Sequence, residues 1–423
     1  MGSMKIFKFG GASVKDAQGF RNVVEIIRRY ADTPTLVVVS ALGKTTNRLE
    51  ELASAFFEGR AETAALFAAI REGHRAILRE LMPEEHAQFS AETEKLFSRL
   101  EHYLQQEPSD NFDFEYDQIV SYGELFSTRM LSAYLEKLQL PHEWMDARRY
   151  VRTDNHYREG AVDWAKTERK IQKHLQEQYP DGVDRLLLTQ GFIAGTPEKF
   201  SITLGREGSD YSAAIFAHAL HAESVTIWKD VEGLLNADPK VFPDAVRLER
   251  IPYREAIELA YYGASVIHPK TIKPLQNKNI PLYVKSFLHP EEPGSVIHSF
   301  KEYQSVPCFI RKTNQVLLSI FSKDFSFIAE ENLSTIFALF ALFNVKINVM
   351  QNSAISFSVC VDAKSTLPQL IEELQTEFAV RYNENVELLS IRHYAAESLA
   401  PYVKGRKVMM EQRSRSMLQV VLK

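Results

Sequence analysis

Two glycine-containing loops in this sequence carry the charged side chains that a phosphate site needs. The first is KFGGASV at 8–14, in which Lys8, Gly10 and Gly11 separate a short apolar run from a helical pattern. Glycines let backbone N–H groups approach an anion, and the dipole of the following helix favours negative charge. On its own, this loop fits a phosphate cradle or a tight turn with a surface lysine.

The second loop is GREGSDY at 205–211, which also lies between an apolar run and a helical pattern. Arg206 can hold a carboxylate or phosphate through two hydrogen bonds, and Asp210 can orient a lysine or hold Mg²⁺. A charged loop with Ser209 as an ordinary helix N-cap is the alternative. Two loops of this kind in one domain favour an anion site.

Other patterns carry less information. The segment WKDVEG at 228–233, followed by NADPK at 236–240, is a strand that runs into a polar loop, where α/β sheets bind nucleotides. Gly43-Lys44-Thr45 resembles the end of a P-loop, but Val38 stands where the first glycine is required. The twelve histidines show no metal-ligand spacing, so we assign no metal ligands.

The composition restricts the class of protein. The 423 residues are 45% hydrophobic and 25% charged, as in a soluble globular protein of two to three domains. A net charge of −5 argues against a nucleic-acid binder with a basic surface. Cys308 and Cys360 are too few for a disulfide framework, which fits a reducing cytoplasm. The longest apolar run, 336–343, is too short to cross a membrane.

The elements that must position these loops are those of an α/β domain. A strand at 5–9, a helix capped near Ser13 and a buried strand at 36–39 form a β-α-β unit. We expect surface helices within 47–107 and a helix over 118–139. Further strands are expected at 186–188, 201–204, 224–228 and 282–284. The large domain should therefore reach about residue 295.

The character of the sequence changes near 290–294, which reads PEEPG. Beyond it the pattern predicts small α+β material. The expected strands are 316–321, 346–350, 355–361, 386–393, 407–411 and 418–422. The expected helices are 330–343, 367–378 and 396–403.

Taken together, the motifs resemble those of aspartokinases in the amino-acid kinase family. The matching segments, in order, are KFGGASV (8–14), VVVSALGKTTN (37–47), SYGE (121–124), TLGREGSDYSAA (203–214), KDVEGLLNADPK (229–240) and YYGASVIHPKTI (261–272). The resemblance implies a three-layer αβα sandwich over 4–295 and two intertwined ACT-type regulatory domains over 305–423. One unit, about 315–382, would be inserted in the other, which would use 306–310 as a strand.

The implied activity is transfer of phosphate from ATP, with Mg²⁺, to the β-carboxylate of L-aspartate. This reaction gives 4-phospho-L-aspartate, the first step toward lysine, threonine and methionine. By analogy, Lys8 and Asp210 are catalytic, and five residues bind the substrate: Ser40, Thr46, Glu124, Arg206 and Ser209. The residues expected at the nucleotide are Lys8, Phe9, Gly10, Gly11, Lys229, Asp230, Leu235, Lys240, Ser265 and Val266.

Two positions depart together from the family pattern. Ser265 stands where the family usually has a lysine, and Lys229 stands where it usually has a threonine. We therefore expect Lys229 to supply the second phosphate-directed ammonium. The alternatives are that Lys229 points to solvent or that Lys270 serves instead.

Regulation is expected to differ as well. Asn348 matches a family aspartate that binds the ammonium of a lysine effector, so Asn348 and Ser353 are the effector candidates and lysine inhibition should be weak or absent. The ACT-type tail is expected to form a homodimer, and the chain end at Lys423 leads us to expect a monofunctional enzyme. The cysteine count, the net charge and the short apolar runs predict a cytoplasmic enzyme with no nucleic-acid or membrane partner. The alternatives are another carboxylate kinase of the family and an ACT-type sensor with a degenerate kinase domain.

Overall fold

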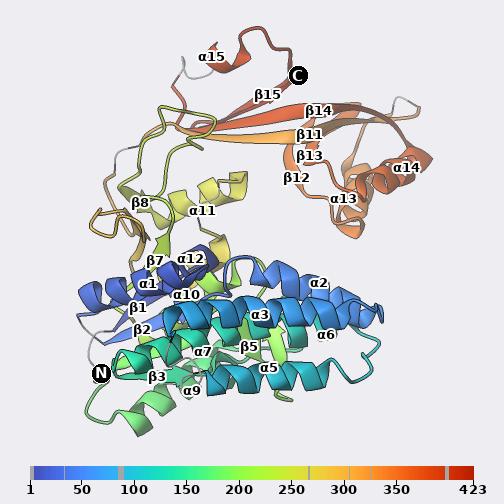
Figure 1. The fold of residues 1–423 in the computed structure, drawn as a ribbon. Coiled ribbons are helices and arrows are strands. Elements are labelled where there is room, and N and C mark those ends of the chain that lie inside the picture. The colour runs from blue at the N-terminus through green and yellow to red at the C-terminus, as the bar shows by residue number, and fades with distance from the viewer. Residues whose placement is uncertain are drawn as a thin grey trace. The chain divides into compact units, whose positions relative to one another are not determined.

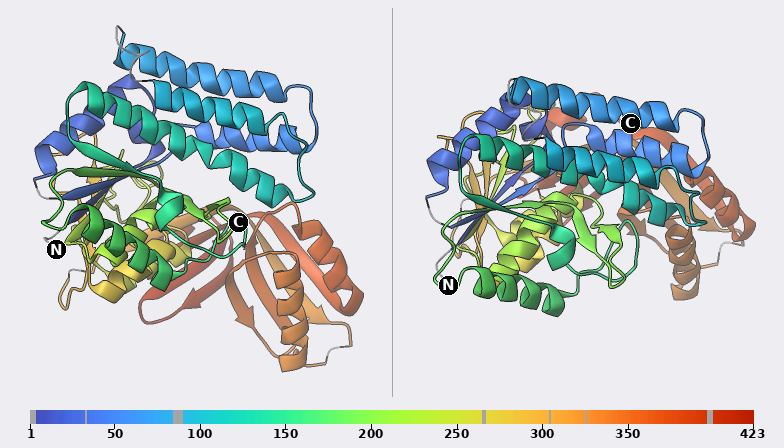
Figure 2. Two further views of the ribbon diagram at one scale, coloured as in Figure 1. Left: turned by 90° about the horizontal axis from the view of Figure 1, so that it is seen from below. Right: turned by 60° about the horizontal axis from the view of Figure 1, so that its bottom comes forward.

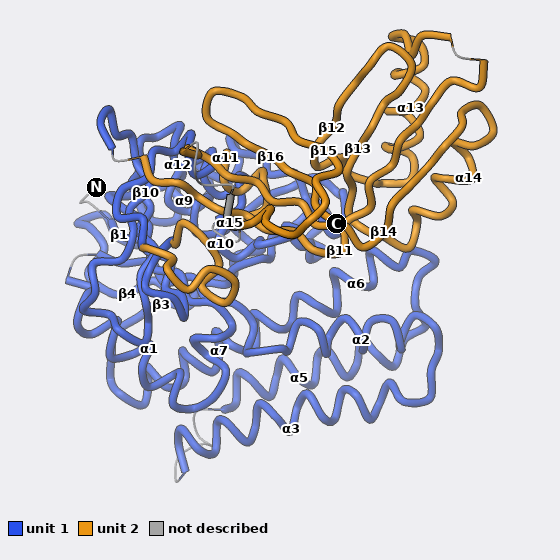
Figure 3. The backbone as a smooth tube through the Cα atoms, turned by 90° about the horizontal axis from the view of Figure 1, so that it is seen from above, with its two compact units in different colours: residues 1–234, 247–257, 266–303 blue, residues 235–246, 258–265, 304–423 orange. Residues whose placement is uncertain are grey.

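The computed structural model describes residues 4–32, 34–83, 90–264, 267–303, 305–324, 326–395 and 400–423 (Figure 1). The chain forms two compact units (Figure 3). Unit 1 comprises Met1–Leu234, Arg247–Ile257 and Val266–Tyr303, and unit 2 comprises Leu235–Val246, Glu258–Ser265 and Gln304–Lys423. None of the helices in these described ranges has the length and apolar content needed to cross a membrane.

Unit 1 is built on an eight-stranded sheet in the order β3-β4-β2-β1-β7-β9-β10-β8. Its strands are β1 (Lys5–Phe9), β2 (Thr35–Val39), β3 (His142–Met145), β4 (Leu186–Gln190), β7 (Ser224–Lys229), β8 (Arg250–Pro252), β9 (Leu282–Ser286) and β10 (Ser295–His298). All neighbouring pairs are parallel except β9 with β10. The chain leaves β1 for β2 on one side and later adds β7 on the other, so the topological switch point, where such sheets bind ligands, lies at the carboxyl ends of β1 and β7.

Helices cover both faces of this sheet. On one face, α1 (Ala17–Tyr30), α3 (Thr63–Leu81) and α7 (Tyr122–Lys137) bury Phe7, Phe9 and Trp228. On the other face, α10 (Gly208–Leu220) packs on β1, β2 and β7, with α9 (Trp164–Gln178) and α12 (Pro269–Lys278) beside it. The predicted three-layer αβα sandwich is confirmed (Figure 2).

The described parts of the region 47–107 form helices as predicted, but these helices are more than a surface layer. It holds α2 (Thr45–Phe57), α3 and α5 (Ala91–Tyr103), which pack with α6 (Phe112–Val120) and α7 (Figure 2). Phe97 stacks on Phe126 at 4.1 Å between ring centroids, and the His74 ring meets both edge-on. The prediction of surface helices missed this second core, because single helices do not show which of their neighbours they pack against.

Several predicted boundaries in unit 1 were wrong. Helix α1 is capped by Asp16, whose carboxylate accepts from Gly19 N at 2.8 Å, while Ser13 is buried in the short 3-10 helix η1 (Gly11–Val14). The expected helix 118–139 is two helices that meet at Ser121, whose hydroxyl donates to Gln118 O and competes with the helical ladder. The strand near 201–204 is β6 (Ser201–Thr203), which pairs only with β5 (Ile193–Gly195) in a separate ribbon. The short helices α8 (Ala147–Tyr150) and α11 (Tyr253–Tyr262) complete the fold.

Unit 2 is a six-stranded antiparallel sheet in the order β12-β13-β11-β14-β16-β15. Its elements are β11 (Cys308–Ser322), α13 (Glu330–Leu342), β12 (Ile347–Asn352), β13 (Ser356–Asp362), α14 (Leu367–Glu377), β14 (Phe378–Arg392), α15 (Ala400–Val403), β15 (Val408–Arg413) and β16 (Met417–Leu422). The strands expected at 306–310 and 316–321 are one continuous strand, and β14 begins eight residues before the expected 386. The expected helix over 396–403 is described only from Ala400 onward.

The two long strands of unit 2, β11 and β14, each belong to both halves of the sheet. The register between β11 and β14 shifts around Gln315, near Asn314 and Asn385, which both adopt positive φ. On one side, the four strands β12-β13-β11-β14 have the order of a ferredoxin-like βαββαβ unit. On the other side, β15-β16-β14-β11 repeats that order with the roles of the long strands exchanged. This antiparallel region fits the expected ACT-type tandem.

We predict that His74 makes the fold sensitive to acid. Burial lowers the pKa of His74 to about 4, against an ordinary value of 6.5. Between pH 6.5 and 4, His74 is protonated in the unfolded chain but neutral in the native protein. The free energy of unfolding should therefore fall by up to about 3 kcal/mol as the pH drops through this range.

In urea unfolding of His74→Phe between pH 4 and 7.5, the free energy of unfolding should not show this fall toward acid pH. His156→Phe, at an exposed loop position, is the matched control and should keep the wild-type dependence of the free energy of unfolding on pH. A wild-type slope in His74→Phe would contradict the prediction.

Candidate active site

A buried carboxylate at the switch point joins two lysines. Asp210, in the first turn of α10, lies 2.6 Å from Lys8 Nζ and 3.6 Å from Lys229 Nζ. Only 4% of the Asp210 side chain is exposed, against 10% for Lys8 and 26% for Lys229. Burial alone would raise the pKa of Asp210, but the two lysines outweigh it and hold that pKa below its ordinary value. The cluster therefore carries a net positive charge, in place to meet an anion.

The geometry of this cluster comes from two neighbouring strands and one helix. Phe9 pairs with Trp228 in the parallel register of β1 and β7, so Lys8 and Lys229 lie near the strand ends on the face that α10 covers. The side chains of Phe9 and Trp228 stack on the opposite face, at 6.1 Å between ring centroids. Phe9 can therefore reach a nucleotide only through its backbone.

The first glycine loop is shaped by close backbone contacts. A Cβ on Gly10 would lie 3.4 Å from Lys8 Nζ, and a Cβ on Gly11 would lie 2.8 Å from Ala41 O. Gly43 N donates to Gly11 O at 3.0 Å, which ties this loop to the segment after β2. A side chain at Gly11 would force the two loops apart, so the glycine is required by the approach of two backbones.

Glu124 is the second buried carboxyl group of the site. It is 2% exposed, and its Oε1 accepts from Ala41 N at 3.2 Å. Its Oε2 has no hydrogen-bond partner within the described ranges. Burial raises the pKa of Glu124 to about 8, although Ala41 N–H and the charge of Lys8 act in the opposite direction. A buried carboxyl with one free oxygen is suited to receive a cationic group from a ligand.

The second glycine loop presents Arg206 at the start of α10. Gly205 and Glu207 both have positive φ, and Glu207 accepts from His268 N at 3.0 Å. Arg206 is exposed, whereas Ser209 packs against Gly191, where a Cβ would lie 2.6 Å from Ser209 Cβ. The loop thus places an exposed guanidinium four residues from the buried Asp210.

The remaining candidates for substrate and nucleotide binding do not all lie in the same unit. Ser40 follows β2 and donates its N–H to Phe9 O at 3.1 Å, and Thr46 is half-buried in the first turn of α2. Asp230 follows Lys229 directly. Leu235 and Lys240 belong to unit 2. Ser265 and Val266 lie outside the described residues.

The two effector candidates lie in unit 2, and Asn348 is engaged in a polar network there. Its Oδ1 accepts from Lys312 Nζ at 2.9 Å, and its Nδ2 donates to Gln315 Oε1 and to Asp362 Oδ1. Ser353 is exposed, and its hydroxyl lies 2.7 Å from Ser356 Oγ. The side chain of Asn348 is therefore occupied by internal partners.

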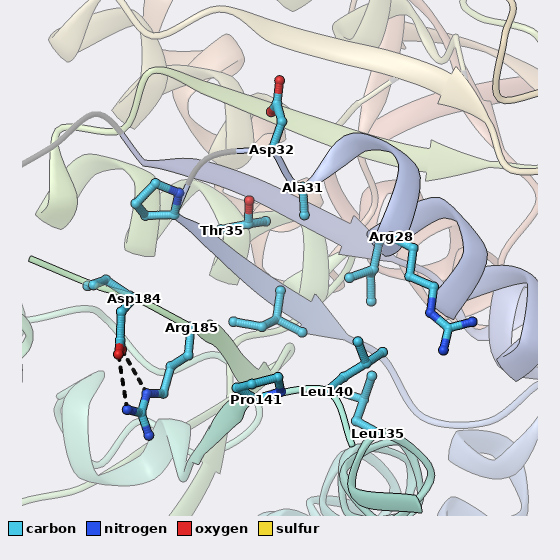
Figure 4. A pocket seen from close by; sticks show the side chains of 13 residues that line it. Arg28, Ala31, Asp32, Thr35, Leu135, Leu140, Pro141, Asp184 and Arg185 are labelled. Carbon is cyan, nitrogen blue, oxygen red and sulfur yellow. Dashed lines mark hydrogen bonds and ion pairs between the residues drawn. The ribbon is translucent and has the colours of Figure 1, made fainter. Parts of the chain in front are cut away.

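A separate cavity of about 390 Å³ lies at the opposite edge of the unit 1 sheet, where β2 and β4 begin (Figure 4). Leu135, Leu140 and Pro141 form an apolar wall, and the ion pair between Asp184 and Arg185 lies at its rim. None of the candidate residues lines it. We therefore keep the candidate site at the carboxyl edge of the sheet.

Three contributors were missed by the sequence interpretation. They are Ala41, which donates to Glu124; Gly123, whose Cβ would lie 2.9 Å from Ala41 Cβ; and Asp117, which is fully buried in α6. Asp117 could have been found, since an acidic residue two positions before the apolar pair Ile119-Val120 needs a partner if it is buried. A backbone donor such as Ala41 leaves no signal in the sequence.

The arrangement suits transfer of a charged group. No three His, Cys, Asp or Glu side chains gather as a metal site within the described part of the chain. Two ammonium groups, a helix N-terminus and two glycine loops converge on a place for phosphate. Glu124 can receive an ammonium group and Arg206 a carboxylate. The ligands that fit are a nucleotide and an amino acid.

Comparisons with known proteins agree with this chemistry. The sequence model of the amino acid kinase family matches residues 3–286. The chain is 34% identical to the Arabidopsis thaliana bifunctional aspartokinase/homoserine dehydrogenase 2 over 69% of its own length and 32% of the relative. It is 30% identical to the Escherichia coli lysine-sensitive aspartokinase 3, covering 92% of this chain and 87% of the relative. The chain thus spans about a third of that bifunctional relative.

Solved structures point to the same fold. The structure of E. coli aspartokinase III in complex with aspartate and ADP superposes with a TM-score of 0.82 at 28% identity, covering 99% of this chain and 96% of the other. The same protein in complex with lysine and aspartate also gives a TM-score of 0.82. A Clostridium acetobutylicum aspartate kinase, at 20% identity and a TM-score of 0.78, supports the fold alone.

We predict that Glu124 lowers stability as the pH rises. Its native pKa of about 8 lies above the ordinary 4.5, so the unfolded chain releases this proton first. Neutral Glu124 makes its full contribution to the free energy of unfolding below pH 4.5. As the pH rises from 4.5 to 8, the free energy of unfolding should fall by about 3–5 kcal/mol.

The comparison of wild type with Glu124→Gln isolates this effect. In urea unfolding, the variant should gain stability relative to wild type as the pH is raised from 5 to 8.5. Parallel curves for the two proteins would show that Glu124 is already charged in the native state.

Proposed function

The chain belongs to the amino acid kinase family, among the aspartokinases, and we propose that it transfers the γ-phosphoryl group of ATP to the β-carboxylate of L-aspartate. The observation that carries this proposal is the cluster of Lys8, Lys229 and Asp210 at the switch point, together with the unpartnered oxygen of Glu124. One part suits the phosphates of a nucleotide and the other suits the ammonium of an amino acid. The product would be 4-phospho-L-aspartate, on the route to lysine, threonine and methionine.

The proposed chemistry requires no general base. The β-carboxylate of aspartate has an ordinary pKa near 3.9, so it is already a nucleophile at neutral pH. The protein must instead bring two anions together and neutralise the charge on the transferring phosphoryl group. Asp210, with its lowered pKa, keeps two ammonium groups in place for that purpose.

On the nucleotide side, Lys8 and Lys229 would contact the phosphates, with N–H groups of Gly10 and Gly11 beside them. Lys270, the alternative to Lys229, is ion-paired with Glu159. That pairing supports Lys229 as the second ammonium. The remaining nucleotide contacts that we propose come from Phe9, Asp230, Leu235, Lys240, Ser265 and Val266.

On the substrate side, Glu124 would bind the α-ammonium and Arg206 the α-carboxylate. A cation beside Glu124 would lower the pKa of this carboxyl group, which would then release its proton to solvent. The resulting charged pair would be strong in its buried setting. Ser209, Ser40 and Thr46 would line the remainder of the pocket. Ser40 directly precedes Ala41, the donor to Glu124, and Thr46 follows in the same segment at the start of α2.

We propose that Mg²⁺ enters bound to the phosphates of ATP. Both oxygens of Asp210 face lysines, and the described residues offer no cluster of three metal-ligating side chains, so the chain suits an ion held mainly by the nucleotide. When bound, the ion would neutralise phosphate charge. The lysines would supply the protein's share of that neutralisation.

We propose that residues 4–295 form the catalytic domain and 305–423 the ACT-type regulatory tandem, with the unit 315–382 inserted. Phe337, Leu342 and Met350 expose large apolar surfaces on α13 and on β12, an edge strand, which supports a homodimer through unit 2. The buried residues Cys308 and Cys360 are not joined in a disulfide, which supports a cytoplasmic location.

An amino-acid effector is proposed at the ACT-type tail, with Asn348 and Ser353 as its candidate ligands. The E. coli relative is named lysine-sensitive and has been solved with lysine. Here Asn348 is neutral and already bonded to Lys312, Gln315 and Asp362. These internal bonds support weak or absent lysine inhibition.

The proposed function is tested by ATP-dependent product formation from L-aspartate, trapped as the hydroxamate with hydroxylamine. L-Glutamate and N-acetylglutamate are the matched alternative substrates. We expect turnover with aspartate only, and added lysine should change it by less than about twofold. Turnover with another carboxylate, or with none, would contradict the proposal.

We predict that Lys229→Met lowers kcat/KM for ATP by about 100-fold while KM for aspartate changes little. The variant keeps most of the side-chain volume and loses the charge that faces Asp210. Lys285→Met is the matched control, because Lys285 pairs with Trp228 and lies over the Trp228 and Tyr30 rings, on the opposite face of the sheet. ATP kinetics close to wild type in Lys229→Met would show that Lys8 alone serves the phosphates.

A further inference from the structure

Asp117 is a fully buried acidic residue in α6 whose two carboxylate oxygens both accept hydrogen bonds from other segments. Thr203 Oγ1 donates to Oδ1 at 2.6 Å, and Arg158 N donates to Oδ2 at 2.8 Å. Burial raises the pKa of Asp117 to about 6, and both hydrogen bonds lower it. At neutral pH the group is therefore charged, and both of its oxygens are in use.

The two donors belong to segments that flank the Arg206 loop. Thr203 is the last residue of β6, three positions before Arg206, and its carbonyl accepts from Gly160 N at 3.0 Å. A Cβ on Gly205 would lie 3.4 Å from both Arg158 O and Glu159 Cγ. The turn at 158–160 therefore runs directly against the base of the Arg206 loop.

The turn itself depends on Asp117. Arg158 has a φ of 66°, which is unfavourable for a residue with a side chain. Its N–H is bonded to Asp117, and its guanidinium lies 4.3 Å from the centre of the Tyr116 ring. Without the carboxylate, the part-buried N–H of Arg158 would lose its acceptor, and the strained backbone at this residue would lose the bond that holds it.

At its other end, α6 leads directly into the helix that carries Glu124. Ser121 N donates to Asp117 O at 3.4 Å, and Glu124 lies in the first turn of α7. Gln118 adds a second tie, since its side-chain amide exchanges two hydrogen bonds with the backbone of Ser201 in β6. Two consecutive residues of α6 thus hold β6 at a set distance from α7.

We propose that Asp117 is a positioning residue that sets the spacing between the Arg206 loop and Glu124. It thereby fits the site to an amino acid that presents an α-carboxylate and an α-ammonium group at fixed separation. The inference deepens the proposed function and rests on it. Asp117 touches neither the substrate nor the nucleotide, so its effect should appear in the binding of one substrate only.

The test is the steady-state kinetics of Asp117→Ala with each substrate varied in turn. We expect KM for L-aspartate to rise at least about tenfold, while KM for ATP stays within about twofold of wild type. Asp117→Asn keeps one acceptor of the same shape and should recover part of the loss. Thr203→Val removes one of the two bonds without touching α6, so it should show the same split if Asp117→Ala fails to fold.

The matched control is Asp113→Ala. Asp113 is on the same helix and its carboxylate pairs with the guanidinium of Arg158 at 3.2 Å, but it lies at the surface, so KM for aspartate should not change. Equal changes in both KM values, or unchanged KM for aspartate in an active Asp117→Ala, would overturn the positioning role alone. Failure of the wild-type protein to turn over aspartate would overturn the proposed function and, with it, this inference.

Discussion

The rest of the site is arranged around the buried ion cluster of Asp210. A carboxylate that is almost fully buried is costly unless opposite charge lies against it, and here two lysines from adjacent strands do so. The cluster fixes the ends of β1 and β7 relative to the start of α10. Because it contains two positive charges and one negative charge, it is best satisfied when an anion binds, so the interaction that orders the sheet edge also defines the ligand.

The two buried carboxyl groups of the site differ in their protonation because their surroundings differ. Asp210 faces two ammonium groups, which lower its pKa, whereas burial raises the pKa of Glu124 to about 8 against the opposing effect of one backbone N–H. In many enzymes, titratable groups with pKa values pushed apart have separate roles. Here charged Asp210 holds two lysines in place, and neutral Glu124 is suited to bind a cationic group of a ligand.

Unit 2 shows how two small α+β repeats can share a sheet. The long strands β11 and β14 each take part in both halves, and the register shifts where the asparagines turn the backbone. The polar network of Lys312, Asn348, Gln315 and Asp362 lies beside this shift, since Gln315 is itself the residue at which the register changes.

The sequence alone determined the α/β class, the two glycine loops and the residue types of the site, because these depend on local patterns. Lys8-x-Gly10-Gly11 and Gly205-Arg206 can be recognised without neighbours, since turns, helix starts and charges are encoded over a few residues. The full length of the long strands of unit 2 and the break at Ser121 were missed because they are not encoded in a local pattern. Alternating hydrophobicity ends where the burial of a strand ends, and the stretches 311–314 of β11 and 379–385 of β14 are exposed or half-buried.

Only the tertiary structure decided which residues act together. Lys229 and Lys8 are 221 positions apart, and they meet at Asp210 because β7 is added beside β1. The charge state of Glu124 follows from its burial against Ala41, and the role of Asp117 follows from two donors that lie 41 and 86 positions away. Proximity and burial are properties of the packed chain, so the protonation and spacing of these groups follow from packing, while the sequence supplies only their chemistry.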